Sequence, residues 1–204
     1  MVKCDCPAAN LRTAANRLRI LTTMFLVVAG VLIALDQITK IWAATTFILN
    51  GSGYTLGLGF HLTYIRNTGA AFGILQGRTM ALGVLSAVVA AALLVYLWRN
   101  SKALPQIHYW ALTLILGGAI GNMIDRFRLG YVIDFIHFYL PNFNYPVFNF
   151  ADSYVVVGAG LLILSSFLPE PPSQHNPKVA AKTSDQKLTD PDFFRHIESD
   201  SAEH

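Results

Sequence analysis

Residues 20–44 read ILTTMFLVVAGVLIALDQITKIWAA, an apolar run interrupted by only two charges, Asp36 and Lys40. A bilayer core of about 30 Å needs about 20 helical residues, so this run is long enough to cross a membrane. It continues through both charges and is longer than the apolar part of most cleaved signal peptides, which favours a retained membrane anchor. Three further runs, at residues 80–98, 107–124 and 150–168, also predict membrane spans.

The composition supports this interpretation. The chain has 204 residues, of which 53% are hydrophobic and 13% charged, whereas soluble domains are roughly 25% charged. We therefore predict an all-α membrane protein, with four transmembrane helices in one bundle over residues 20–168.

The basic residues predict the orientation of this bundle. Lysines and arginines gather in cytoplasmic loops. The leader, residues 1–19, and the short link after the second run are both basic, which places them and both chain ends in the cytoplasm. The basic residues concerned are Lys3, Arg12, Arg17, Arg19, Arg99 and Lys102. The longer links, residues 45–79 and 125–149, then face outward.

These outward links have structure of their own. Residues 60–64 alternate between apolar and polar side chains, which is the period of a β-strand. We expect a small extramembrane sheet on the outer face, with the second link also lying at the membrane interface. The tail, residues 169–204, has too little apolar surface to fold and is predicted to be a disordered cytoplasmic extension.

Acidic residues are scarce before position 170: there are five, all aspartates. Four lie inside or beside the apolar runs, where a charge near a helix centre costs at least about 2.5–3.5 kcal/mol. An ionisable residue in such a place is by default a candidate for a functional site. With the predicted orientation, all four collect at the outer surface; they are Asp36, Asp125, Asp134 and Asp152.

Neighbours in the sequence divide these aspartates. Asp36 can pair with Lys40 one helical turn later, and Asp125 is followed by Arg126, so both also suit a purely structural role at a helix end. Asp134 and Asp152 have no basic neighbour. Two such carboxyls brought together share a proton, which gives the base and the acid of an aspartic protease.

Asp152 has a structural alternative, because it can sit in the first turn of the last helix with Asn149 as N-cap. Gly117 and Gly121 have the spacing typical of close helix packing.

Five motifs together resemble one known family, the bacterial lipoprotein signal peptidases, also called signal peptidase II. The motifs are DQITK (36–40), NTGAAF (67–72), GGAIGNMIDR (117–126), VIDF (132–135) and FNFADS (148–153). They occur in the same order as in the family, and the resemblance covers about residues 20–168. The chain departs from the family only in the leader and the tail.

The resemblance implies a four-helix aspartyl endopeptidase of the bacterial inner membrane, with its active site at the outer face. Its substrates would be prolipoproteins carrying diacylglycerol on a cysteine, cut just before that cysteine. It implies a cradle and lid for the substrate, inhibition by globomycin, and no metal or organic cofactor. The implied catalytic pair is Asp134 and Asp152, and the implied substrate-binding or supporting positions are Asp36, Lys40, Asn67, Asn122, Asp125, Arg126 and Asn149.

Other classes of protein fit less well. An ion-coupled transporter also uses intramembrane aspartates, but its site lies near the midplane between repeats, and the first two runs do not resemble the last two. A non-catalytic scaffold that binds lipoproteins is a second alternative. Zinc-protease and serine-hydrolase motifs are absent from the sequence. The net charge of +3 resides in short loops and forms no nucleic-acid-binding patch. We expect a monomer that contacts substrate and membrane lipid.

Overall fold

The computed structural model describes residues 7–51, 53–70, 74–100 and 104–167, and over residues 7–22 the backbone alone. The predicted disordered tail lies outside the described residues, as do the first six residues of the leader and part of the 67–72 motif.

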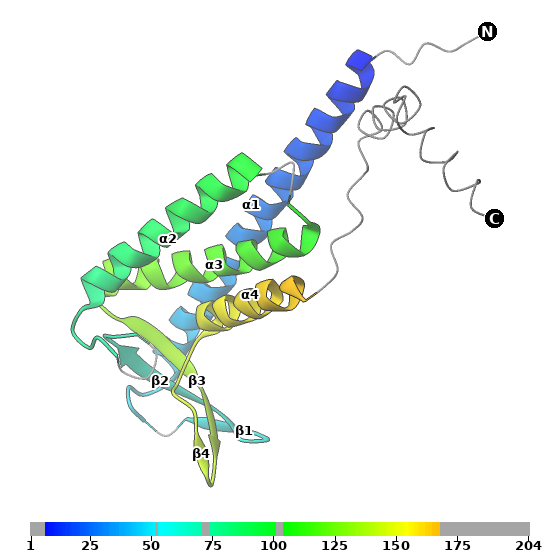
Figure 1. Cartoon of the computed structure of the whole chain (residues 1–204). Coiled ribbons are helices and arrows are strands. Elements are labelled where there is room, and N and C mark those ends of the chain that lie inside the picture. The colour runs from blue at the N-terminus through cyan, green and yellow to red at the C-terminus, as the bar shows by residue number, and fades with distance from the viewer. Residues whose placement is uncertain (1–6, 52, 71–73, 101–103, 168–204) are drawn as a thin grey trace, which may run out of the picture. The chain divides into compact units, whose positions relative to one another are not determined.

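Four helices contain or overlap the four apolar runs (Figure 1). They are α1 (Pro7–Thr46), α2 (Thr79–Asn100), α3 (Gln106–Leu129) and α4 (Phe150–Ser166). Thr23–Thr46 of α1, together with α2 and α3, is long and apolar enough to cross a membrane. The 17-residue α4 is at the lower limit for a span, so the fourth crossing stays a prediction.

Helix α3 packs between its neighbours, because small residues let it approach them closely. A Cβ added at Gly117 would lie 3.2 Å from Leu32 of α1, and one at Gly118 would lie 2.3 Å from the backbone oxygen of Ala151 on α4. The packing role expected for Gly117 is therefore confirmed. Gly121 also packs tightly, with its added Cβ 2.5 Å from the carboxylate of Asp36.

The two longer links contribute to one antiparallel sheet with strand order β1-β2-β3-β4. The strands are β1 (Tyr54–Gly57), β2 (Phe60–Asn67), β3 (Val132–Leu140) and β4 (Phe143–Asn144). The prediction of a membrane helical protein with a small extramembrane sheet is confirmed. The second link does more than lie at the interface, because β3 is an inner strand that pairs with β2 along most of its length.

The sheet is fixed to the helices at two places. Gly130 ends α3 with a left-handed backbone (φ 76°), and its N–H bonds the oxygen of Arg126, so that β3 starts two residues later. A buried apolar cluster then joins the end of α1 to β2 and β3; it contains Ala43, Phe47, Tyr64, Ile133 and Phe135. These two connections hold β3 against the C-terminal ends of α1 and α3.

Candidate active site

Asp134 is the third residue of β3, opposite Ile65 of β2. Its side chain is only 2% exposed. Asn67, near the end of β2 on the same face of the sheet, donates from Nδ2 to Asp134 Oδ2 at 2.9 Å. The sheet register thus supplies a buried carboxyl with an amide donor.

Asp152 lies in the first turn of α4, where the helix dipole stabilises negative charge. Asn149 is the N-cap: its Oδ1 accepts from the backbone N–H of Asp152 at 2.9 Å, and its own N–H donates back to Asp152 Oδ2 at 3.3 Å. Together these bonds form a capping box. The predicted N-cap is confirmed. Asn122 of α3 donates from Nδ2 to Asp152 Oδ1 at 2.8 Å.

Asn149 also brings the two aspartates together. Phe148 pairs with Ile136 of β3 through two backbone hydrogen bonds of 2.8 and 2.9 Å, which places the start of α4 beside β3. From there Asn149 Nδ2 donates to Asp134 Oδ1 at 2.7 Å. One fully buried amide therefore contacts both members of the pair.

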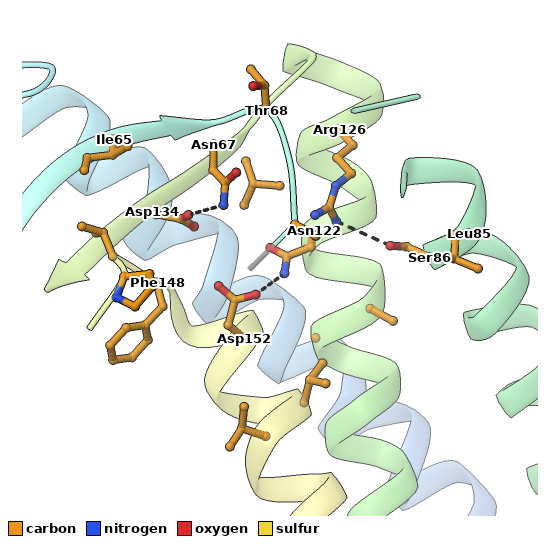
Figure 2. Close-up of a pocket in the computed structure, with 18 of the residues that line it drawn as sticks. Ile65, Asn67, Thr68, Leu85, Ser86, Asn122, Arg126, Asp134, Phe148 and Asp152 are labelled. Carbon is orange, nitrogen blue, oxygen red and sulfur yellow. Dashed lines mark hydrogen bonds between the residues drawn. The ribbon is translucent and has the colours of Figure 1, made fainter. Parts of the chain in front are cut away.

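Both carboxylates face a single cavity of about 800 Å³. Figure 2 shows Asp134 and Asp152 reaching into it from β3 and α4, with Asn67 and Asn122 beside them. The opposite part of the lining is apolar and comes from three helices, with Leu85 and Val89 on α2, Ile115 on α3, and Val155 and Val156 on α4. A polar end and an apolar wall therefore share one space.

The pKa of Asp134 is raised from 3.8 to about 7, chiefly by burial and next by the nearby negative charge of Asp152. The amides of Asn67 and Asn149 and the charge of Lys40 oppose this shift. A carboxyl with that pKa holds a proton through much of the neutral range. The pair can therefore present one protonated and one ionised carboxyl, as acid–base hydrolysis requires.

Behind this pair lies a buried ionic cluster centred on Lys40, which is 1% exposed. Its Nζ lies 2.9 Å from Asp36 Oδ2, 3.0 Å from Asp125 Oδ2 and 2.9 Å from Asn122 Oδ1. The Asp36–Lys40 pairing predicted from the four-residue spacing is confirmed.

The expectation that Arg126 is the partner of Asp125 was wrong, because Asp125 forms its salt bridge with Lys40. Adjacent residues on a helix point in different directions, and Asp125 faces Lys40 on α1 while Arg126 faces the cavity lining. Arg126 donates to the backbone oxygen of Gly69 at 3.3 Å and to Ser86 Oγ at 3.5 Å. Arg126 does lie in the last turn of α3, where its backbone oxygen accepts the N–H of Gly130, so its expected place near a helix end is confirmed.

Asp134 and Asp152, which have no basic neighbour in sequence, also lack a salt bridge among the described residues. The structure surrounds them instead with three asparagine amides. Of the nine residues singled out from the sequence, six line the cavity or bridge its carboxylates: Asn67, Asn122, Arg126, Asp134, Asn149 and Asp152. The other three, Asp36, Lys40 and Asp125, form the cluster behind them.

Gln37 also belongs to this cluster, although its position in the sequence did not single it out. Its Nε2 donates to Asp125 Oδ1 at 3.0 Å, and it also approaches Asp36 Oδ2 and the oxygen of Gly121 at 3.2 Å each. A polar amide inside an apolar span was the available signal, since such groups need partners there. Ser86, the hydroxyl that Arg126 reaches on α2, gave a similar signal.

Comparison with known proteins identifies the family of this chain. Residues 28–168 match a family model described as signal peptidase (SPase) II. The chain belongs to the signal peptidase II family. As a member, the protein is a peptidase, and hence a hydrolase, with membrane-spanning helices.

Individual relatives agree with the family model. The lipoprotein signal peptidase of Nostoc sp. is 40% identical to this signal peptidase over 166 residues, which cover 79% of this chain and 100% of the relative. That of Caldanaerobacter subterraneus is 45% identical over 141 residues, or 68% and 92% of the two chains. A solved bacterial membrane enzyme superposes with a TM-score of 0.64 at 31% identity, covering 74% of this chain and 95% of that one.

Proposed function

We propose that the protein is an aspartic endopeptidase that removes signal peptides from prolipoproteins carrying diacylglycerol on a cysteine, by cleavage just before that cysteine. The observation that carries this proposal is the meeting of Asp134 and Asp152 at one cavity, bridged by Asn149. Membership of the signal peptidase II family and relatives named lipoprotein signal peptidases support the class of substrate.

In the proposed mechanism, Asp152 is the base and Asp134 the acid. Asp152, in the first turn of α4, accepts a proton from water, whose oxygen attacks the scissile carbonyl carbon. Asp134 donates its proton to the carbonyl oxygen. In the collapse of the tetrahedral intermediate, Asp134 recovers that proton, while Asp152 passes its proton to the leaving nitrogen. The two carboxyls thus return to their starting states.

The remaining polar residues have supporting roles in this proposal. Asn67, Asn122 and Asn149 hold the carboxylates in place, while Arg126 holds the backbone oxygen of Gly69, within the 67–72 motif. Asp36, Lys40 and Asp125 anchor this polar layer from behind.

The cavity suits a substrate that is itself in the membrane. Its apolar wall can take a lipid chain or the helix of a signal peptide, while its polar end meets the peptide bond. We propose that this end faces outward from the bacterial inner membrane and that both chain ends are cytoplasmic. Residues 20–168 would form the peptidase domain of a monomer that needs no cofactor, and globomycin would compete for the cavity.

A cleavage assay tests the class of substrate. The purified protein in lipid vesicles is given one prolipoprotein in two forms, with and without diacylglycerol on the cysteine. We expect cleavage of the lipidated form alone, with mass spectrometry showing a product that begins at the modified cysteine. Equal cleavage of both forms, or cleavage at another bond, would contradict the proposed specificity.

A further inference from the structure

The orientation of the Asn122 amide is determined by Lys40. A lysine ammonium has three N–H donors and no acceptor. Two of the oxygens around Lys40 Nζ belong to Asp36 and Asp125, and the third is Asn122 Oδ1 at 2.9 Å. Asn149 Nδ2 donates to the same oxygen at 3.2 Å. If the amide were reversed, its NH₂ group would face two donors.

As a result, the donor side of Asn122 must face the catalytic pair. Its Nδ2 lies 2.8 Å from Asp152 Oδ1. The NH₂ group can only donate, so this oxygen of Asp152 can only accept. A reversed amide would present its oxygen to Asp152, and a carboxylate has no proton to donate to it.

The same cluster fixes the backbone beside each aspartate. Asp36 Oδ1 accepts from the N–H of Ala151 at 2.9 Å, one residue before Asp152. Asp125 Oδ2 accepts from the N–H of Ile133 at 3.2 Å, one residue before Asp134. Lys40 contacts both of these carboxylates, so a single buried cation lies between the supports of β3 and α4.

We propose that Lys40 is a positioning residue for Asp152 and acts through Asn122: it holds the amide with its donor toward Asp152 and so keeps that residue available as the base. This role rests on the proposed function, and it assigns to a residue of α1 the task of keeping the site in its active arrangement. Gln37 contributes by donating to Asp125 Oδ1, which leaves Oδ2 for Lys40 and Ile133.

Other charges also surround Asp152, and the test must separate their direct effects from an effect through Asn122. The charged groups that line its cavity are Arg66 on β2, Arg126 on α3 and Asp134 on β3, and those of the cluster behind it are Asp36 and Lys40 on α1 and Asp125 on α3. Removing Lys40 therefore changes both the local charge and the amide orientation. A double-mutant comparison distinguishes the two.

The experiment measures kcat for the lipidated prolipoprotein as a function of pH. In Asn122→Asp, Lys40 keeps an oxygen partner but Asp152 faces a carboxylate in place of an amide donor. We expect the acidic limb of the profile to move up by about one pH unit or more, with a smaller change in KM. Thr113→Val removes a buried hydroxyl elsewhere on α3. It is the matched control and should leave the acidic limb of the pH profile unmoved.

Comparison with Lys40→Met then tests whether Lys40 acts through Asn122. Alone, this change should move the acidic limb in the same direction, since the amide is free to turn. In an Asn122→Ala background it should move the limb by less than about a third of its effect alone, because the intermediary is gone. A full additional shift would mean that Lys40 acts by its charge directly and would overturn the proposal.

The other possible results can also be told apart. If Lys40→Met does not fold, as judged by thermal unfolding in detergent, Asn122→Asp decides alone, and a wild-type limb in that variant overturns the proposal. A wild-type protein that fails to cleave the substrate would contradict the proposed function itself. Cleavage by the wild type with an unmoved limb in Asn122→Asp would contradict only the role of Asn122.

Discussion

Asn149 donates a hydrogen bond of 2.7 Å to Asp134 while it caps the helix that carries Asp152. One side chain therefore couples a strand of the sheet to the first turn of α4. Because its Oδ1 is held by the N–H of Asp152, the amide can present only its NH₂ group to Asp134. The relative position of the two carboxylates thus depends on this residue.

Replacing Asn149 separates its two roles. Asn149→Ala should lower kcat by about 10- to 100-fold and reduce stability by about 0.5–2 kcal/mol, the usual cost of a lost cap. Asn149→Ser restores a capping oxygen without an NH₂ donor, so it should recover the stability but not the activity. Turnover and thermal midpoint are measured on the same samples. A wild-type rate in Asn149→Ala would remove this residue from the site.

The pKa of Asp134 predicts how activity depends on pH. With a folded pKa of about 7, this carboxyl loses its proton as the pH rises through neutrality, and the proposed acid is then lost. We expect kcat to fall above about pH 7 in a steady-state assay. A kcat that stays constant from pH 6 to pH 9 would contradict the assignment of Asp134 as the acid.

The same shift has a consequence for stability. Because burial raises the pKa of Asp134 above its unfolded value of 3.8, the folded state binds the proton more tightly. The stability that Asp134 gains from this tighter proton binding is fully present below about pH 4 and is lost as the pH rises through about 7. The thermal midpoint of the wild type should therefore fall between pH 5 and pH 8 relative to that of Asp134→Ala. Parallel curves for the two proteins would contradict the shift.

The close contact between α3 and α4 predicts an asymmetry between two glycines. In Gly118→Ala the new Cβ would lie 2.3 Å from the backbone oxygen of Ala151, so α4 must move away. We expect a loss of about 1–3 kcal/mol together with reduced activity, since Ala151 precedes Asp152. Gly160→Ala on the exposed face of α4 meets nothing within 4 Å and should be neutral or stabilising by up to about 1 kcal/mol. Equal thermal midpoints for the two variants would contradict this packing.

Local patterns in the sequence predicted local structure well. The apolar runs predicted the helices, the Asp36–Lys40 spacing predicted an ion pair, and Asn149 was correctly expected to cap α4. In each case, the deciding interaction lies within one helical turn. Such contacts follow from the period of the helix and need no knowledge of the tertiary fold.

Contacts between distant segments could not be predicted in this way. The register that sets Asn67 beside Asp134 joins positions 67 residues apart. The hydrogen bond from Lys40 to Asn122 joins positions 82 residues apart. The error over Asp125 and Arg126 has the same origin, because Asp125 takes its partner from α1. The resemblance in motifs implied that these residues belong to one site, but only the structure shows which atom donates to which.

The most direct test of the proposed mechanism is single-turnover cleavage of a lipidated prolipoprotein by Asp134→Asn and Asp152→Asn. Each change keeps the size of the side chain but removes its ability to exchange a proton. With folding checked by thermal unfolding, we predict that both variants lose about 10²–10⁴-fold or more in rate while still binding the substrate. Cleavage at the wild-type rate by either folded variant would contradict the proposal that these two carboxyls carry out the reaction.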